Sequence, residues 1–179
     1  MRTRHQHGFS LVELMIVVAI IGIIGLIAVP NMVTGLPASR VRSAARDTAA
    51  QVRRARAVAL RDNRQVHIVF DVAADTSTVD GTAFPLQGSL PDTYGSGVRY
   101  GFGSATQAVD GGALPSSPVT FSGATPTLIF TPQGLAVDSA GTPNTGQVYL
   151  TNRRSHAWCV QVTTAGTVML KHWTGSGWE

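Results

Sequence analysis

The 179-residue chain has little cysteine, little lysine and little charge of either sign. Its single cysteine, Cys159, cannot form an internal disulfide, and the sequence has no CxxC pair or Cys/His cluster of the kind that binds zinc. Charged residues make up 13%, about half the usual share, and the 19 glycines and 9 prolines have no collagen-like period. These shortages exclude a disulfide scaffold, a collagen and a long disordered tail, and they predict one folded domain.

Basic charge is concentrated in two segments. Arg2 and Arg4 lie among the first eight residues, and residues 40–64 carry eight arginines against two aspartates. Residues 65–179 carry four basic and seven acidic groups, a net charge of −3. This distribution does not describe a general polycation built to bind nucleic acid.

Residues 9–29 form an apolar run, FSLVELMIVVAIIGIIGLIAV, that is long enough to cross a membrane. As a helix, its 21 residues span about 30 Å, the thickness of the hydrocarbon core of a bilayer. The run is longer than the apolar core of a secretory signal peptide and ends without a small-x-small cleavage pattern. Because Arg2 and Arg4 precede it, the positive-inside rule predicts a cytoplasmic N-terminus and an outward-facing chain from residue 30 onward.

Glu13 interrupts this run, and an ionisable side chain in a membrane segment is costly unless water or a partner compensates it. In one interpretation, Glu13 lies near the cytoplasmic interface and reaches water. In the other, its carboxylate has a cationic partner in a neighbouring molecule. The residues around Glu13 favour the second interpretation.

The block GFSLVEL, from Gly8 to Leu14, follows a short basic leader at the start of the apolar run. It closely resembles the class III signal of type IV prepilins and type II secretion pseudopilins. The resemblance implies that a prepilin peptidase cuts between Gly8 and Phe9 and then N-methylates the new Phe9 amine. Gly8 would be the residue that the peptidase requires.

The same resemblance implies a role in assembly for Phe9, Glu13 and Pro30. Glu13 would pair with the N-terminal amine of a neighbouring subunit when the helices stack into a filament, which satisfies both charges in a low-dielectric bundle. Pro30 also matches pilins at its position. Because proline lacks an N–H group, Pro30 is expected to kink or locally melt the helix.

Residues 30–38, PNMVTGLPA, predict a break or kink between two helical segments. A second helix is predicted from about Ser39 to Arg61, because small and apolar residues recur there every three or four positions. These residues are Val41, Ala45, Thr48, Val52, Ala55 and Ala59. We interpret this stripe as contact with a sheet. The arginines on the other faces form either a solvated surface or contacts with acidic neighbours in a filament, DNA or lipid headgroups.

Beyond Asn63 the pattern changes to the alternation of β-strands. The predicted strands cover residues 65–71, 127–131, 147–151, 157–163 and 167–173. The last two are joined by Thr164-Ala165-Gly166 and form a predicted hairpin, in which Cys159 packs as a small hydrophobe. Residues 73–126 are rich in Gly, Ser, Thr, Pro and Ala, which predicts short edge strands joined by long loops.

For the whole chain, the pilin resemblance implies an α+β fold in which one long N-terminal helix packs on an antiparallel β-sheet domain. Three features resemble the GspH/FimT family of minor pilins and pseudopilins. They are the segment AARDTAAQVRRARAVALRDNRQVHIVF, the later LIFTPQGLAV, and a closing hairpin with a glycine before its last strand. This resemblance covers nearly all of residues 9–173.

The sequence predicts neither an enzyme nor a cofactor or metal site. His67, His156 and His172 are scattered, without the spacing of zinc ligands. Ser155 and His156 are adjacent in the chain, so their side chains point apart and cannot act as nucleophile and base.

DNA is considered as a ligand because some FimT-type minor pilins bind it through an arginine-bearing motif that begins at the glycine of the closing hairpin. In this chain that position reads GTVM, residues 166–169, and has no arginine. Arg153, Arg154 and Lys171 are the cations near this end that could contact a polyanion, and so few cations predict weak, salt-sensitive binding.

We therefore expect a leader over residues 1–8, a membrane and polymerisation helix over 9–29, a kink and amphipathic helix over 30–64, and a periplasmic β-rich domain over 65–179. The expected function is a minor pilin-like subunit that primes or caps a type IV pilus. The alternatives are an H-type minor pseudopilin of a type II secretion system and a DNA-binding minor pilin for natural transformation. Expected partners are other pilins or pseudopilins, the prepilin peptidase and an inner-membrane assembly platform. The subunit would reside in the inner membrane and could move into an extracellular pilus.

Overall fold

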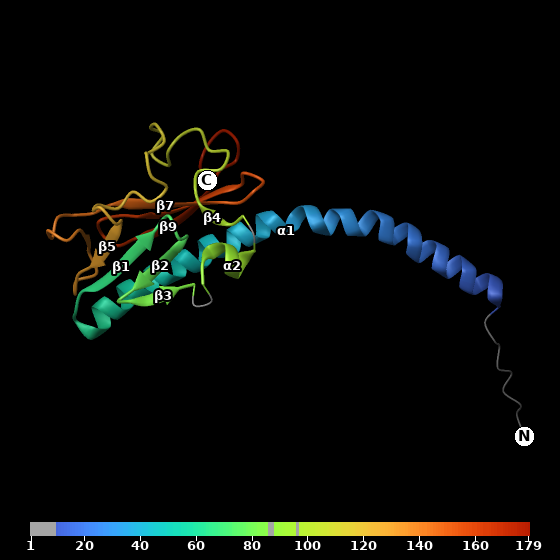
Figure 1. The fold of residues 1–179 in the computed structure, drawn as a ribbon, viewed down its shortest axis with the longest axis horizontal. Helices are drawn as coiled ribbons and strands as arrows, with labels where there is room; N and C mark the ends of the chain where they lie inside the picture. The colour runs from blue at the N-terminus through green and yellow to red at the C-terminus, as the bar shows by residue number, and fades with distance from the viewer. Residues whose placement is uncertain (1–9, 86–87, 96) are drawn as a thin grey trace, which may run out of the picture. The chain divides into compact units, whose positions relative to one another are not determined.

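The computed structural model describes residues 10–85, 88–95 and 97–179, apart from the side chains of residues 25–35. The elements, in chain order, are α1 (Leu11–Asp62), β1 (Val66–Asp71), β2 (Thr76–Val79), β3 (Thr82–Phe84), α2 (Leu90–Tyr94), β4 (Arg99–Tyr100), β5 (Thr127–Phe130), β6 (Ala136–Val137), β7 (Gly146–Thr151), β8 (Ala157–Val162) and β9 (Val168–His172) (Figure 1). The chain divides into two compact units, Met1–Leu36 and Pro37–Glu179.

The strands of the Pro37–Glu179 unit form two antiparallel sheets. One has the strand order β3-β2-β1-β5-β6, and the other has the order β4-β7-β8-β9. The five strands predicted from the sequence are confirmed as β1, β5, β7, β8 and β9, each within one residue of the expected bounds. The predicted closing hairpin is also present, with Val160 paired to Leu170. The structure thus confirms the expected α+β class.

The core lies between α1 and the two sheets. Every residue of the predicted helical stripe is buried, from Val41 to Ala59, and Ala44 and Ala49 join it. Phe70 and Phe130 from one sheet and Leu150 from the other pack in the same cluster. Small side chains on the helix let the strands approach closely, so the stripe is the sheet contact that the sequence predicts.

Residues 30–38 are predicted to form a break or a kink; the break is absent, because α1 is one helix of 52 residues that continues through them, and the kink stays a prediction. A proline removes only one N–H donor from a helix, so the helix can continue because the hydrogen bonds before and after the proline still form. The side chain of Pro30 is outside the described set, so its part in a kink stays a prediction.

Residues 73–126 contain more regular structure than their composition predicts. The β2–β3 hairpin turns at Asp80 and Gly81, whose φ angles of 47° and 81° are both positive, as a two-residue type I′ turn requires. Helix α2 begins where the carboxylate of Asp92 accepts hydrogen bonds from the amide (3.0 Å) and hydroxyl (2.6 Å) of Ser89. The Asp-Gly pair and the Ser-x-x-Asp spacing are signals that predict both elements.

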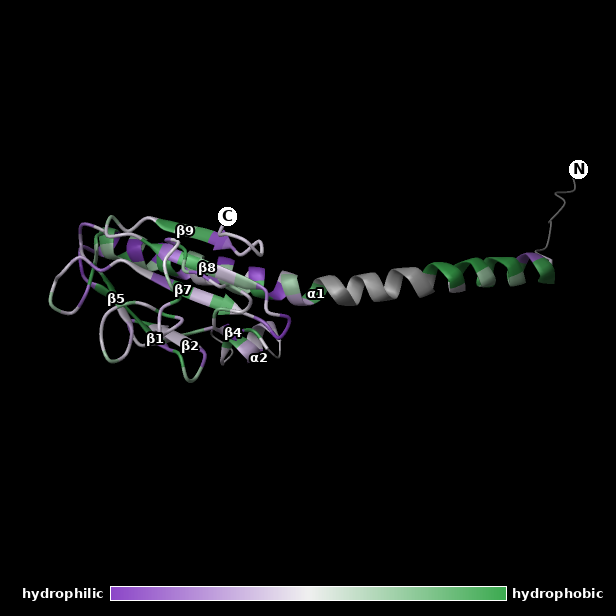
Figure 2. Cartoon of the chain, turned by 90° about the horizontal axis from the view of Figure 1, so that it is seen from above, coloured by the Kyte–Doolittle hydropathy of each residue, from purple (hydrophilic) through white to green (hydrophobic). Residues whose placement is uncertain are grey.

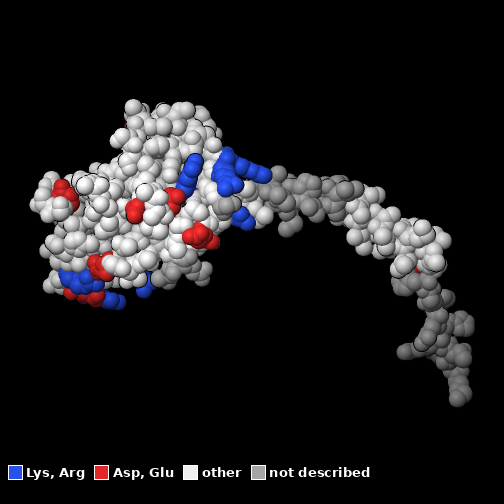
Figure 3. All heavy atoms as spheres, viewed as in Figure 1, with Lys and Arg blue, Asp and Glu red and all other residues white. Residues whose placement is uncertain are grey.

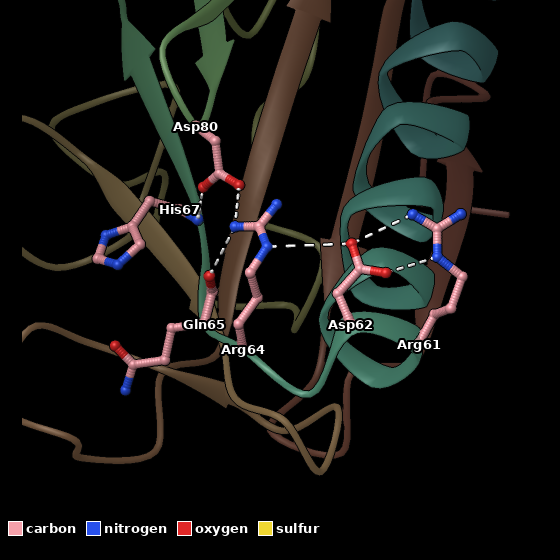
Figure 4. A network of polar contacts seen from close by, with 6 residues as sticks. All are labelled: Arg61, Asp62, Arg64, Gln65, His67 and Asp80. Carbon is pink, nitrogen blue, oxygen red and sulfur yellow. Dashed lines mark hydrogen bonds and ion pairs between the residues drawn. The ribbon is translucent and has the colours of Figure 1, made fainter.

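A polar network joins the end of α1 to the first sheet (Figure 4). Asp80 accepts a hydrogen bond from the amide of His67 at 2.9 Å and pairs with Arg64 at 2.5 Å. On the helix, Asp62 pairs with Arg61 at 2.6 Å. These ion pairs are largely exposed, so they orient the end of α1 more than they stabilise the fold.

Candidate assembly site

Helix α1 begins within the methylation-type block. The hydroxyl of Ser10 accepts a hydrogen bond from the amide of Glu13 at 3.2 Å, and the Ser10 carbonyl accepts one from the Leu14 amide at 3.2 Å. Ser10 therefore caps the helix, and Glu13 lies in its first turn. Gly8 and Phe9 lie outside the described residues, so their processing stays a prediction.

The first described turns of α1 expose apolar side chains. Each described residue from 10 to 24 is exposed, and Figure 2 shows this stretch as hydrophobic. Leu11 is 75% exposed and Ile21 is 63% exposed. Such a large exposed apolar surface is typical of a segment that meets lipid or other proteins.

The carboxylate of Glu13 lies within this apolar surface and is itself exposed. In the part of the chain that the structure describes, no helix is long and apolar enough to cross a membrane.

The structure places the three cations of the predicted polyanion contact on two elements. Arg153 and Arg154 lie exposed in the turn between β7 and β8, whereas Lys171 is half-buried on β9 and pairs with Cys159 across the β8–β9 ladder. The Cys159 side chain is fully buried, as the sequence predicts for a small packing residue, and burial raises the pKa of its thiol.

Asn152 shapes the turn that carries the two arginines, which the sequence analysis did not anticipate. Its side-chain oxygen accepts hydrogen bonds from the amides of Arg154 (3.0 Å) and His156 (3.2 Å). Its amide group donates to the carbonyl of Pro37 at 2.7 Å. Asn152 is 7% exposed, so this buried link fixes the β7–β8 turn against α1.

Two arginines of α1 have structural roles that differ from both predicted ones. Arg56 donates from Nε to the carbonyl of Gly134 at 3.0 Å and from Nη2 to the carbonyl of Ala165 at 2.9 Å. Arg53 donates to the carbonyl of Val168 at 3.1 Å. These side chains bind the closing hairpin and the turn between β5 and β6 within the same chain, where the planar guanidinium can satisfy several carbonyls at once. Sequence spacing placed them on the helix face but could not identify distant carbonyls as their partners.

Two protein-family models match the chain. Residues 3–29 match the prokaryotic N-terminal methylation motif, and residues 44–166 match the type II transport protein GspH. No curated protein and no solved structure gives a significant match. The first segment covers most of the predicted leader and the whole apolar run, and the second covers most of the buried part of α1 and most strands of the two sheets.

Proposed function

Because the chain belongs to the GspH family of type II transport proteins, we propose that it is a minor subunit of a pilin-type filament. The family and the methylation motif identify a prepilin-type, membrane-anchored pilin or pseudopilin, as the sequence resemblance predicts. Such proteins are structural subunits, not enzymes, and they assemble with other pilins. The proposal adds that this chain primes or caps a type IV pilus.

The exposed apolar surface of α1 is the observation that supports this role most directly. Residues 10–24 need an apolar cover, which lipid supplies before assembly and neighbouring helices supply in a filament. Glu13 is the acidic residue in this stretch. A neighbouring N-terminal amine would neutralise it and set the stagger between subunits, because either charge alone is costly in a helical bundle.

The H-type minor pseudopilin of a type II secretion system is the second candidate. The matched family, which is described as a type II transport protein, favours it. Both candidates require the same processing at Gly8 and Phe9 and the same Glu13 contact. They differ in which filament receives the subunit.

Mass spectrometry of sheared filaments and of membranes from the native cell separates these candidates. We expect a peptide that begins with N-methylated Phe9. Its presence at low stoichiometry in sheared pili would support a minor pilin, whereas its restriction to membranes would favour the pseudopilin. An intact Met1 in both fractions would contradict prepilin processing.

Replacement of Glu13 by alanine tests the assembly contact. We expect Glu13→Ala to be cleaved normally, because cleavage depends on Gly8, but to enter filaments more than about tenfold less, since breaking a buried ion pair costs about 3–5 kcal/mol. Glu13→Gln should fail equally because it keeps the size and loses the charge. Glu179→Ala, which removes an exposed carboxylate of the outer domain, is the matched control. Normal incorporation of Glu13→Ala would contradict the pairing.

A further inference from the structure

Exposed arginines gather at the end of the Pro37–Glu179 unit that carries Pro37 and β4. We call this surface the basic end. It consists of Arg40, Arg42, Arg99, Arg153 and Arg154. Figure 3 shows blue side chains grouped at this end, over β4 and the first turns of α1 within the unit.

Contacts between distant segments bring these arginines together. A β-carbon on Gly97 would clash with the side chain of Arg153, and one on Gly95 would clash with that of Arg40, so both arginines pack against the same loop. Arg99 pairs with Thr151 at the edge of the second sheet, directly before the β7–β8 turn. Arg40, Arg99 and Arg153 therefore lie at the end of the unit where α1, the loop before β4 and the β7–β8 turn meet.

Two carboxylates near this surface, those of Asp75 and Asp47, accept hydrogen bonds within the protein. Asp75 is half-buried, and its carboxylate interacts electrostatically with Arg99. It also accepts a hydrogen bond from the Tyr100 amide at 2.8 Å. Asp47 accepts one from the Tyr94 hydroxyl at 2.8 Å. Arg61 and Arg64, near the other end of α1, form ion pairs with Asp62 and Asp80.

A cleft of about 350 Å³ opens beside these arginines. Its lining includes Arg42, His156, Trp158, His172 and Trp173. The guanidinium carbon of Arg42 lies 5.8 Å from the centroid of the Trp158 ring, which stacks on His172 at 5.2 Å. Arginine beside tryptophan is the combination found where proteins meet the headgroup layer of a membrane, because both side chains have an apolar body and a polar tip.

We propose that the basic end docks on acidic phospholipid headgroups of the membrane that holds residues 9–29, as long as the subunit is outside a filament. Arg40 follows Val29, the end of the apolar run, by only 11 residues, about 16 Å of helix. The headgroup layer extends about 5–8 Å beyond the hydrocarbon core, and charges act over a further 8 Å or so at physiological salt. Arg40 and Arg42 are the first arginines along the chain after the run, within reach of that layer.

A membrane fits this surface better than DNA does. Residues 65–179 carry a net charge of −3, so a long polyanion that follows the domain beyond the basic end meets repulsion. In the proposed docking, a bilayer contacts only the end of the unit that the chain joins to the apolar run at Pro37. The inference concerns the unassembled subunit and depends on membrane anchoring, not on which filament the subunit joins.

Arginine footprinting on the full chain tests the docking. The protein is placed in nanodiscs of phosphatidylcholine alone or with 40% phosphatidylglycerol, a composition chosen to give an anionic surface, and is treated with phenylglyoxal. We expect modification of Arg40, Arg42 and Arg153 to fall at least about threefold in the anionic discs and to recover in 0.5 M NaCl. Arg54 and Arg61, exposed elsewhere on α1, serve as internal controls and should react equally in both discs.

Two triple variants that lose the same charge at different places test whether docking depends on the basic end or on overall charge. The chain has three tryptophans, and all of them lie at or beside the cleft. Trp158 and Trp173 line it, and the ring of Trp178 lies 5.5 Å from that of Trp173. Their quenching by nitroxide-headgroup lipid therefore reports docking. We expect R40Q/R42Q/R153Q to lose at least half of the anionic-disc quenching and R54Q/R61Q/R64Q, which loses the same charge, to keep it.

Three results would overturn the proposal. The first is equal footprints in neutral and anionic discs, and the second is equal loss of quenching in both triple variants. The third is protection of Arg40, Arg42 and Arg153 by a DNA oligonucleotide in neutral discs without protection by phosphatidylglycerol, which would assign the surface to nucleic acid. Equal melting temperatures of both variants and the native chain establish that folding is intact. No filament is present in these experiments, so their failure leaves the Glu13 and Phe9 tests unaffected.

Discussion

At the scale of single residues, arginine has different roles along one helix. Arg56 and Arg53 reach carbonyls around the closing hairpin, whereas Arg42 lies over the ring of Trp158. The sequence predicts only a solvated surface or intermolecular contacts for all of them, because helical periodicity gives only the face on which a residue lies. The partner of a long side chain depends on which strand lies beside that face.

Arg56 is predicted to be the α1 arginine that matters most for stability. Arg56→Ala removes two hydrogen bonds to the carbonyls of Gly134 and Ala165. We expect the free energy of unfolding to fall by about 1–3 kcal/mol, because hydrogen bonds from charged donors are stronger than neutral ones. Urea denaturation of the full chain in detergent measures the change.

Arg54→Ala is the matched control, because Arg54 is exposed on the same helix. Its effect should stay within about 0.5 kcal/mol, as for most surface substitutions. If both substitutions cost the same, the hairpin contacts of Arg56 would contribute no stability.

At the scale of elements, the predictions succeeded where the pattern was long or strongly alternating. The buried stripe of α1 and five strands followed from periodicity alone, because burial on one face imposes it on the sequence. The short elements β2, β3 and α2 were not placed. Their signals, Asp80-Gly81 and Ser89-x-x-Asp92, are turn and capping chemistry rather than periodicity.

Gly81 is predicted to be required for the β2–β3 hairpin. Its φ is +81° and no atom lies near the position of an added β-carbon, so Gly81→Ala introduces backbone strain without a steric clash. We expect a loss of about 1–2 kcal/mol in the free energy of unfolding.

Gly177→Ala provides the comparison for Gly81→Ala, since Gly177 has equally open surroundings and no positive φ. Its melting temperature should match that of the native chain, while that of Gly81→Ala falls. A lower melting temperature for both would indicate that space, not backbone conformation, limits these positions.

At the scale of the whole molecule, packing the second sheet buries groups that titrate at alkaline pH. Burial raises the pKa of the Cys159 thiol and raises that of Tyr149 to about 12. The pKa of Tyr100, which is also buried, lies above its ordinary value for the same reason. In each case the folded state keeps a proton that the unfolded chain releases.

The fold is therefore predicted to lose stability at alkaline pH. The unfolded state binds fewer protons than the folded state once pH exceeds about 8.5 for the thiol and about 10 for the tyrosines, so the free energy of unfolding falls as pH rises. Each group contributes a slope of up to about 1.4 kcal/mol per pH unit. Urea denaturation between pH 7 and about 11 measures this slope.

Cys159→Ala identifies the share of the thiol in this loss. This variant should remove the pH dependence between about 8.5 and 10 and leave the steeper fall above about 10, where tyrosine titrates. Constant stability up to about pH 11 would mean that these groups ionise at the same pH in the folded and unfolded states, which would contradict the effect of burial on their pKa values.

The sequence alone determined the family resemblance, the apolar run of residues 9–29, the buried stripe of α1 and the main strands. These are local properties, since each depends on residue types at short, regular spacing. The tertiary structure alone decided that α1 is continuous, that Asn152 holds the β7–β8 turn to Pro37, and that arginines from three segments form the basic end. Such features depend on which distant segments the two sheets bring together, and the spacing of residues along the chain does not determine which segments become neighbours.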